Sequence, residues 1–333
     1  MSLKHKMTIQ EIAEEAEVSK TTVSFFLNGK REKMAAKTWD RIAAVIDKYN
    51  YRPSTTARLM TAKHSFLLGV IIGDITHHFS NRLVKGIAQV CREGGYQILI
   101  GTSEYDEKAE SNHIDRMIDM AVDGVILQPC GNPENSIEKL KKAGIPVVFI
   151  DSKPEDMPFW VVTSNYQSTF DAISSCIEEN YKQVIMFSAT PNVLTSRKER
   201  YTGCLDALHK KDTPYYVQII DENTSESEIY ETVERNYKKD KTLVFVPNCW
   251  LLPKVFKALK PLYDKMPSEI GLLGFDNDDW ADLCVPTVST IVQPAYQEGA
   301  TAAALLIGHI KGKSDKPTMS TLDCEAVWRG STL

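Results

Sequence analysis

The chain has 333 residues, which exceeds one ordinary domain and predicts two or three. Its net charge of -5 at pH 7 gives no reason to expect general attraction to nucleic acids or membranes. The charge is unevenly spread, however, because residues 1–63 carry twelve Lys and Arg against seven Asp and Glu, a net of +5 that leaves about -10 for the remainder. We infer a small basic N-terminal region attached to an acidic body.

The cysteine pattern and the hydropathy pattern narrow the class of protein. Seven cysteines are scattered singly, without a CxxC pair, as expected for reduced buried thiols in a cytoplasmic protein. No apolar run approaches the roughly 18 residues of a membrane span, and the N-terminus is polar. Phosphate-binding loops of the GxGxxG or GxxxxGK[ST] type are absent from the sequence, so we expect no nucleotide cofactor. Because no histidine stands at ligand spacing from the scattered cysteines, we expect no metal either.

Three short helices are predicted in the basic region. Thr8 and Glu11 form a capping-box pattern at the start of a helix of about residues 8–16, and Ser19 is placed to cap a second helix that reaches Leu27. A third amphipathic pattern runs from Trp39 to Tyr49. Two helices joined by so tight a turn, with a third closing the core, are typical of a helix-turn-helix unit. A small helical bundle with no DNA-binding role is the alternative.

The second helix has an unusual outer face. Val23, Phe26 and Leu27 form its buried stripe, which leaves Lys20, Thr21, Ser24 and Phe25 facing outward. Small and basic hydrogen-bonding residues suit a surface that contacts a polyanion, whereas an outward phenylalanine does not suit a plain solvated face.

After residues 51–62, where Pro53 ends the helical region, short apolar runs alternate with amphipathic segments. Strands are predicted at about 67–72, 97–101, 124–128, 146–150, 183–188, 216–220, 243–247 and 270–275, with helices between most of them. Apolar strands separated by helices indicate parallel sheets covered on both faces. The pattern fits either two doubly wound lobes or one barrel of the TIM type.

The sequence resembles the bacterial lactose-repressor (LacI/GalR) family along essentially its whole length. The most specific stretches are TIQEIAEEAEVSKTTVSFFLNGK and NYRPSTTARLM, supported by Arg200-Tyr201-Thr202-Gly203 and Gly274-Phe275-Asp276-Asn277. The resemblance implies a homodimer in which each chain has an all-α helix-turn-helix headpiece (1–53) and a hinge helix (54–64). It implies an α/β core (65–333) of two doubly wound parallel-sheet lobes, similar to periplasmic binding proteins of type I. The N-lobe would comprise about 65–162 and 293–322, and the C-lobe about 163–292 and 323–333.

The resemblance also implies which headpiece residues contact an operator in double-stranded DNA. Lys20, Thr21 and Phe25 occupy base-reading positions, and the phosphate-contacting positions are held by Thr8, Ser19, Thr22, Ser24 and Asn28. Position 25 is usually an arginine that reads guanine. We therefore expect Phe25 to pack on a thymine methyl group and to change the preferred half-site. Within the hinge, Met60 matches a leucine that wedges into the minor groove, and Ala57 and Arg58 would lie along the groove.

In the core, the resemblance implies an effector site between the lobes. Arg200 and Asp276 align with the ligand-anchoring arginine and aspartate, and Asn248 with a third polar ligand. Further candidates are Asp151, Ser196, Phe79 and Ser80, and Trp250 would add an aromatic wall. The segment from Val246 to Trp250 departs from the usual family pattern and is similar to the subgroup that represses ketodeoxygluconate and related sugar-acid breakdown. A sugar acid whose carboxylate pairs with Arg200 is therefore favoured over a neutral sugar or a sugar phosphate.

Other functional classes fit the sequence less well. Cys249 has no evident histidine partner, so no catalytic residues are expected, and the adjacent His77 and His78 would point apart rather than bind one metal. A stand-alone sugar-binding protein would share the core but would lack the basic N-terminal region. The expected function is a repressor that an effector releases from DNA by an allosteric coupling free energy of about 1–3 kcal/mol.

Overall fold

A computed structural model describes residues 7–51, 64–154, 157–237, 240–313 and 318–333. The chain divides into two compact units, Met1–Ser65 and Phe66–Leu333, which are described separately below. The predicted hinge helix, including Ala57, Arg58 and Met60, lies outside the described residues.

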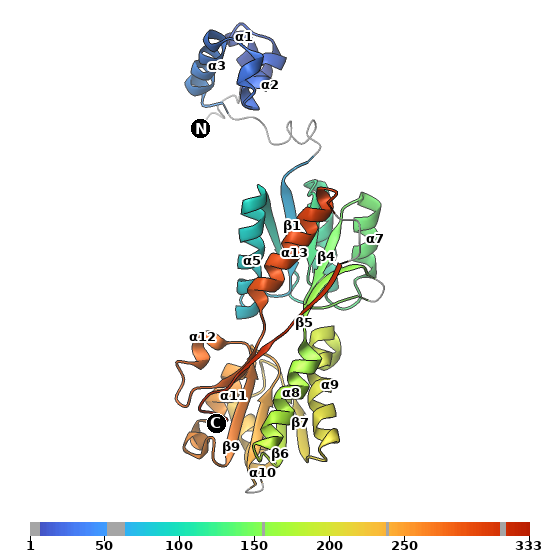
Figure 1. Ribbon diagram of the computed structural model, residues 1–333, viewed down its shortest axis with the longest axis vertical. Helices are drawn as coiled ribbons and strands as arrows, with labels where there is room; N and C mark the ends of the chain where they lie inside the picture. The colour runs from blue at the N-terminus through green and yellow to red at the C-terminus, as the bar shows by residue number, and fades with distance from the viewer. Residues whose placement is uncertain (1–6, 52–63, 155–156, 238–239, 314–317) are drawn as a thin grey trace. The chain divides into compact units, whose positions relative to one another are not determined.

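The first unit is helical and contains α1 (Ile9–Glu15), α2 (Lys20–Leu27), the 3-10 turn η1 (Arg31–Lys33) and α3 (Ala36–Tyr49) (Figure 1). The predicted capping box is confirmed: the Glu11 amide donates to Thr8 Oγ1, and the Thr8 amide donates to Glu11 Oε2 at 2.7 Å. Ser19 caps α2 by accepting a hydrogen bond from the Thr22 amide at 3.1 Å. Both helix starts therefore have the side chains that their unsatisfied amides require.

The core of this unit is small and comes from all three helices. Its buried members are Ile12, Ala13, Ala16, Val23, Ile42 and Val45. Phe26 and Leu27 pack against them, and Phe26 contacts Trp39 with ring centroids 4.3 Å apart. The predicted stripe of α2 therefore faces the core, and it fixes which side of α2 remains outside.

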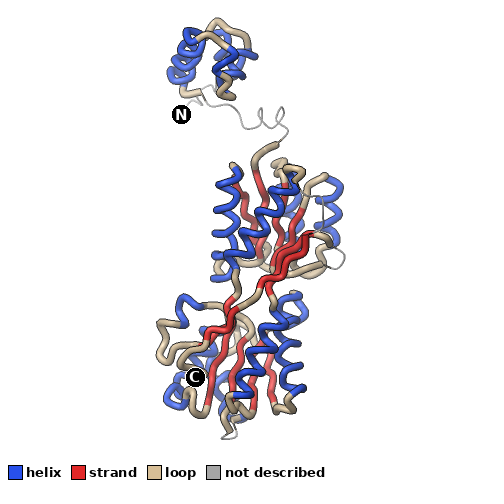
Figure 2. The backbone as a smooth tube through the Cα atoms, in the orientation of Figure 1, coloured by secondary structure: helices blue, strands red, loops and turns tan. Residues whose placement is uncertain are grey.

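The second unit contains two six-stranded sheets, each with helices on both faces (Figure 2). The N-lobe sheet has the order β11-β5-β4-β3-β1-β2 and is parallel throughout. Its strands are β1 (Leu67–Ile72), β2 (Gln97–Thr102), β3 (Gly124–Leu127), β4 (Val147–Ile150), β5 (Phe159–Thr163) and β11 (Thr318–Leu322). Two separate sheets confirm the two-lobed fold and exclude the TIM barrel.

The C-lobe sheet has the order β12-β10-β9-β8-β6-β7, and only β12 runs antiparallel to its neighbour. Its strands are β6 (Gln183–Ser188), β7 (Tyr215–Ile219), β8 (Thr242–Val246), β9 (Ile270–Phe275), β10 (Ser289–Val292) and β12 (Glu325–Val327). The chain passes between the two sheets after β5, after β10 and after β11. Three crossings place the ends of both sheets beside one another.

Helices cover the four sheet faces in pairs. In the N-lobe, α5 (His78–Gly94) and α13 (Ala295–Ile310) pack together on one face, and α6 (Glu107–Asp119) and α7 (Glu134–Ala143) cover the other. In the C-lobe, α8 (Asn165–Glu178) and α9 (Thr195–Lys210) oppose α10 (Glu226–Asn236) and α11 (Leu252–Ala258). The remaining elements are the four-residue helix α12 (Asp278–Ala281) and the 3-10 turns η2 (Pro191–Val193) and η3 (Lys260–Lys265). Among the described residues, no helix is both long enough and apolar enough to span a membrane.

Candidate functional site

A pocket opens where the carboxyl ends of the parallel strands of the two lobes meet, the position at which open α/β sheets bind ligands. It is lined by His77, Phe79, Tyr105, Gln128, Asp151, Leu194, Ser196, Arg197, Arg200, Asn248, Cys249, Trp250, Asp276 and Gln293. Its cavity volume is about 40 Å³. A cavity of about 150 Å³ holds a benzene ring, so the lobes enclose room for water molecules but not for a sugar in this conformation.

Arg200 forms the floor of the pocket and is held from three sides. Its Nε donates to Asn165 Oδ1 at 2.7 Å, one terminal nitrogen donates to the Pro247 carbonyl at 3.0 Å, and the other donates to Gln293 Oε1 at 2.7 Å. The guanidinium also lies 3.9 Å from the centroid of the Phe275 ring. Three fixed acceptors and an aromatic face leave the guanidinium little freedom to rotate.

Asp276 follows β9 and lies close to Arg200. Its Oδ1 accepts a hydrogen bond from the Gln293 amide at 2.9 Å, whereas Oδ2 is buried without a hydrogen-bond partner. Burial raises the pKa of this carboxyl to about 6, although Arg200 and the Gln293 amide oppose the rise. A buried acceptor without a partner costs free energy in the empty pocket and becomes favourable when a ligand donates to it.

Asp151 provides the corresponding carboxylate from the N-lobe. Its Oδ2 accepts from Gln128 Nε2 at 2.7 Å and from Ser196 Oγ, across the lobes, at 3.3 Å. Its amide donates to Glu298 Oε1 at 2.6 Å beneath the pocket. Burial, and then Asp151, raises the pKa of Glu298 well above its ordinary value, which favours the neutral acid there. The pocket floor therefore avoids a third full negative charge.

Several residues after the strands that form the pocket have a left-handed backbone conformation. Positive φ angles occur at Tyr105 after β2 (58°), at Asp151 after β4 (61°), and at Asp276 and Asn277 after β9 (53° and 58°). Non-glycine residues adopt this region infrequently, and it costs about 1–3 kcal/mol when the surroundings enforce it. Tyr105, Asp151 and Asp276 line the pocket from these positions, whereas the Asn277 side chain donates to the Cys249 carbonyl.

The pocket includes seven of the eight effector residues expected from the sequence: Phe79, Asp151, Ser196, Arg200, Asn248, Trp250 and Asp276. Ser80 is buried in α5 and does not line it. Sequence reasoning missed seven pocket residues: His77, Tyr105, Gln128, Leu194, Arg197, Cys249 and Gln293. Gln128 and Gln293 directly follow β3 and β10, so for these two the position after a strand was the available signal.

Chemistry other than binding has little support in the pocket. Burial, and then the nearby Asp276, raises the pKa of the Cys249 thiol to about 12, so it stays protonated at neutral pH. The two adjacent histidines have separate partners, since His77 Nε2 lies 3.2 Å from Asp74 and His78 Nδ1 lies 3.2 Å from Asp279. Neither a thiolate nucleophile nor a shared metal fits this arrangement.

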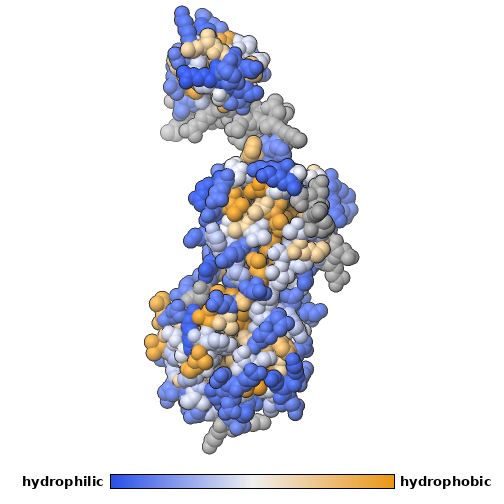
Figure 3. Space-filling model, viewed as in Figure 1, coloured by the Kyte–Doolittle hydropathy of each residue, from blue (hydrophilic) through white to orange (hydrophobic). Residues whose placement is uncertain are grey.

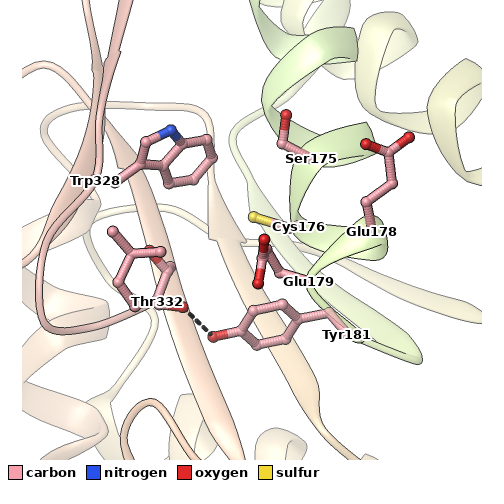
Figure 4. Close-up of a pocket in the computed structure, with 8 residues that line it drawn as sticks. Ser175, Cys176, Glu178, Glu179, Tyr181, Trp328 and Thr332 are labelled. Carbon is pink, nitrogen blue, oxygen red and sulfur yellow. Dashed lines mark hydrogen bonds between the residues drawn. The ribbon is translucent and has the colours of Figure 1, made fainter.

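A second pocket lies in the C-lobe between the end of α8 and the C-terminal segment (Figure 4). Glu178 and Glu179 line one side and Trp328 the other, while Tyr181 closes it with a hydrogen bond to the Thr332 carbonyl. It holds no cation among its lining residues and lies away from the strand ends. The convergent polar groups of the interlobe pocket make that pocket the better candidate for a ligand site.

The helical unit carries a second candidate surface, formed by α2, η1 and the first turn of α3. Five cations, Lys20, Lys30, Arg31, Lys33 and Lys37, make no ion pair with any described residue. By contrast, Arg41 pairs with Glu17, and Lys48 pairs with Glu15 at 2.7 Å. The uncompensated positive charge therefore lies on the α2 and η1 side.

Apart from Thr8, which is exposed at the start of α1, the predicted DNA-contacting residues of this unit are found along α2 and at its ends. Ser19, Lys20, Thr21 and Asn28 are exposed, and Thr22, Ser24 and Phe25 are half-buried. Phe25 is not part of the core cluster, and Lys30 Nζ lies 5.8 Å from its ring centroid. Several of the polar side chains also support the helix: Ser19 Oγ and Thr22 Oγ1 lie 2.8 Å apart, and Asn28 donates to the Ser24 carbonyl at 2.8 Å.

The fold and the pocket define a two-lobed ligand-binding core, preceded in the chain by a helical unit with an unpaired basic face. Comparison with known proteins agrees: residues 8–54 match the family model of bacterial regulatory proteins of the lacI family, and residues 68–314 match a periplasmic binding protein domain. The chain therefore belongs, over most of its length, to the family of periplasmic binding protein domains, and it carries in front of that domain the DNA-binding domain of the bacterial regulatory proteins of the lacI family. It is a DNA-binding transcriptional regulator, and neither an enzyme nor a stand-alone binding protein.

Individual relatives match over the same extent. The HTH-type transcriptional regulator KdgR of Bacillus subtilis is 27% identical over 329 residues, covering 97% of each chain. A crystal structure of the lac repressor dimer bound to operator and an anti-inducer matches with a TM-score of 0.83 and 18% identity, covering 99% of this chain and all of the other. A LacI family regulator from Enterococcus faecium with bound ribose matches 80% of this chain and 98% of its own, with 22% identity and a TM-score of 0.70. At these identities the structures establish the fold alone.

Proposed function

We propose that this regulator represses a carbohydrate or sugar-acid catabolic operon and is released by a small sugar-type effector bound in the interlobe pocket. The observation that carries the proposal is Asp276, whose buried Oδ2 has no hydrogen-bond partner beside a fixed Arg200. A ligand that donates a hydroxyl proton to this oxygen would remove the cost of its burial.

The chemistry of the pocket supports a polyhydroxylated ligand. Carboxylates at Asp151 and Asp276 accept from hydroxyl groups, while the amides of Asn248 and Gln128 can both donate and accept. Phe79 and Trp250 provide apolar surface for the C–H faces of a sugar ring. Ser196 completes the proposed set, together with Arg200, whereas Ser80 does not enter the pocket. The ribose bound by the regulator from Enterococcus faecium is a ligand of this kind.

The same proposal assigns the α2 face to operator DNA. Lys20, Thr21 and Phe25 would contact base edges, and Thr8, Ser19, Thr22, Ser24 and Asn28 would contact phosphates. The five unpaired cations support this orientation, because phosphate contacts supply most of the salt-dependent affinity for DNA. Ala57, Arg58 and Met60 remain proposed groove contacts outside the described residues.

We also propose a cytoplasmic homodimer divided into a headpiece (1–53), a hinge (54–64) and a core (65–333). Leu283 and Val285, in the loop after α12, are 82% and 84% exposed, and apolar residues stand at the surface of this loop in Figure 3. We propose that these two exposed apolar side chains form part of the contact between protomers. A lac repressor structure with the same fold is described as a dimer bound to its operator.

The proposed mechanism follows from the size of the pocket. The cavity of about 40 Å³ is smaller than the cavity of about 150 Å³ that holds a benzene ring, which favours binding of a sugar with the lobes further apart. Contacts across the lobes would then break or shift, including Ser196 to Asp151 at 3.3 Å and Lys153 to Glu199 at 3.8 Å. That change would alter the geometry of the dimer and of its hinges, and with it the affinity for the operator.

The test is a titration of the full chain onto DNA from its own upstream region, with and without 2-keto-3-deoxygluconate, at two salt concentrations. We expect tight, salt-dependent binding that the compound weakens. Binding that no sugar or sugar acid changes would leave the DNA-binding regulator in place and refute the proposed effector class. Failure to bind any upstream DNA would refute the assignment of the α2 face.

A further inference from the structure

The two arginines of the pocket, Arg200 and Arg197, lie one turn apart on α9 but have different surroundings. Arg200 is 7% exposed and directs three of its N–H groups at protein acceptors. Its charge also acts on the adjacent Asp276, whose pKa it lowers against the larger effect of burial. Arg200 is therefore already engaged by the protein in the empty pocket, although two of its five N–H groups remain available.

Arg197 has no such engagement. It makes no ion pair or hydrogen bond with any described residue, and its guanidinium lies 4.9 Å from the centroid of the Tyr105 ring across the lobes. An aromatic face positions a guanidinium without using its N–H groups, so the planar pair of donors remains available. The Arg197 charge reaches other pocket groups: it lowers the pKa values of Cys249 and Tyr105 against the larger effect of burial.

The surroundings of Arg197 favour an anion. Leu194, Ser196 and Arg197 lie at the start of α9, where Leu194 is the N-cap and provides no side-chain cap. The first amides of a helix have no acceptor within the helix and carry the positive end of its dipole. Burial lowers the pKa of His77 and favours the neutral ring, so this residue adds no positive charge and Arg197 is the cation of this side of the pocket. The pocket is thus polarised, with carboxylates at Asp151 and Asp276 and a free cation at Arg197.

We infer that Arg197, supported by the start of α9 and the Tyr105 ring, is the anion subsite of the pocket and binds the carboxylate of a sugar acid. This inference rests on the proposed effector function and names the chemical class of its ligand. It replaces the sequence-based expectation that Arg200 pairs with the carboxylate. Arg200 instead holds the pocket floor and presents its remaining donors to hydroxyl or carbonyl oxygens, while Asp151 and Asp276 accept from hydroxyl groups.

A carboxylate fits this subsite better than a phosphate. A guanidinium and a carboxylate are both planar and form two parallel hydrogen bonds. A phosphate would bring nearly two negative charges into a pocket where Asp151 and Asp276 already lie, with one unpaired arginine to balance them. The geometry therefore predicts that a sugar acid binds more tightly than the matching sugar alcohol or sugar phosphate.

The experiment compares matched ligands on the full-length chain by isothermal titration calorimetry. The pairs are 2-keto-3-deoxygluconate with 3-deoxyfructose, and gluconate with glucitol, in which a carboxylate is replaced by a hydroxymethyl group; glucose 6-phosphate tests the phosphate alternative. The proteins are wild type, Arg197→Gln, Arg197→Lys and the control Lys198→Gln. Lys198 is exposed on the same helix outside the pocket, so its substitution changes the same charge without touching the subsite.

In wild type we expect at least one acid to bind more tightly than its alcohol. Arg197→Gln should weaken binding of that acid about 10- to 100-fold, the usual effect of losing charged hydrogen bonds, and should leave the alcohol unchanged. Arg197→Lys should recover part of the loss, and Lys198→Gln should match wild type. The thermal midpoint of each variant reports whether it is folded, and Arg197→Gln should lose only the contribution of the cation–π contact with Tyr105.

Three results would overturn the inference: an alcohol or the phosphate that binds wild type as tightly as the best acid, an acid preference that survives in Arg197→Gln, or no binding of any acid. Each would leave the DNA-binding function intact. Conversely, an acid that binds through Arg197 without changing operator affinity would uphold the subsite and refute the proposed release of the repressor.

Discussion

Asp276 shows how a single pocket residue can limit the stability of the empty protein. Its pKa is raised to about 6 mainly by burial, above the value of an unfolded aspartate. A group whose pKa is raised by folding favours the folded state most at pH values below its unfolded pKa, and that contribution is lost as pH rises through the folded pKa. The charged carboxylate therefore destabilises the protein at neutral pH, by at most about 3 kcal/mol for a shift of about two units.

We predict that Asp276→Asn stabilises the ligand-free chain at pH 8 by up to about 2–3 kcal/mol, and that the gain shrinks as pH falls from 6 towards 4. Asparagine also tolerates the positive φ of this position and keeps an acceptor for the Gln293 amide. Thermal unfolding at pH 8 and pH 5 measures the difference, with the exposed Asp119→Asn as an isosteric control. If Asp276→Asn were no more stable than wild type at pH 8, the raised pKa of Asp276 would be contradicted.

Effector affinity should fall in the same variant, because a neutral amide is the poorer acceptor.

Phe25 allows a second prediction for a single residue. Its ring is half-buried, lies outside the core cluster and belongs to the face that carries unpaired cations. We expect sites selected from random DNA by wild type to have a thymine opposite Phe25, and Phe25→Ala to lose that preference at a cost of about 1 kcal/mol per half-site. Lys20→Gln should lower the affinity for DNA without affecting the base opposite Phe25. An obligatory guanine opposite Phe25 would contradict the thymine contact.

The different roles of Arg197 and Arg200 could not be predicted from the sequence. Both residues lie on one helix, and the family resemblance marks only Arg200. What distinguishes them is tertiary: Asn165 and Gln293, which lie 35 and 93 residues away in sequence, accept hydrogen bonds from Arg200, and no comparable acceptor meets Arg197. Local spacing does not contain that information.

The loop after β2 shows how a neighbouring strand positions a pocket side chain. A Cβ atom added at Gly73, just after β1, would lie 2.3 Å from Tyr105 Cε1, so Gly73→Ala must displace the Tyr105 ring. We predict a loss of about 1–3 kcal/mol in the stability of this loop packing. Because that ring supports the Arg197 guanidinium, binding of a sugar acid should weaken more than binding of its alcohol.

Gly308→Ala provides the matched control for this substitution. Gly308 lies in α13, and an added Cβ there would meet no atom within 4 Å. Alanine in a helix is favoured over glycine by up to about 1 kcal/mol, so this variant should be as stable as wild type or slightly more stable. Calorimetric titration of the acid and alcohol pair measures both variants. An unchanged acid preference in Gly73→Ala would show that the Tyr105 ring does not support the subsite.

Secondary structure was predictable where burial is complete. Strands such as β1, β6 and β9 are apolar and almost fully buried, and the sequence placed them within the correct residues. The sequence did not indicate β11, because its residues alternate between half-buried and exposed positions and include Thr318, Ser320 and Thr321. β5 and β10 were missed as well: they are only five and four residues long, and β10 begins with the polar Ser289 and Thr290. β11 and β5 are defined by pairing with each other across more than 150 residues of sequence.

At the scale of the whole molecule, the exposed loop after α12 predicts how two copies associate. If Leu283 and Val285 are buried in the dimer, Leu283→Glu and Val285→Glu should each weaken it by about 3 kcal/mol, a roughly 100-fold rise in the dimer dissociation constant. Sedimentation velocity at several concentrations measures this change, with Met120→Glu, 51% exposed at the end of α6, as the control. If neither substitution changed the dimer dissociation constant, the contact between the two copies would lie elsewhere on the surface. Operator affinity should fall with dimerisation, because two half-sites are bound together.

The small volume of the pocket also predicts that effector binding and operator binding are coupled. The free energy needed to separate the lobes, including loss of the Ser196 to Asp151 hydrogen bond at 3.3 Å, must be supplied by differential binding of the effector to the two conformations. The coupling is then reciprocal: an effector that lowers operator affinity by about 5- to 150-fold must itself bind more weakly to the operator complex by the same factor. Two titrations measure the two factors, effector onto free and DNA-bound protein, and DNA onto free and effector-bound protein. Equal factors would support one two-state core. Operator affinity that falls while effector affinity is unchanged by DNA would violate this linkage and would show that the compound acts at DNA rather than in the pocket.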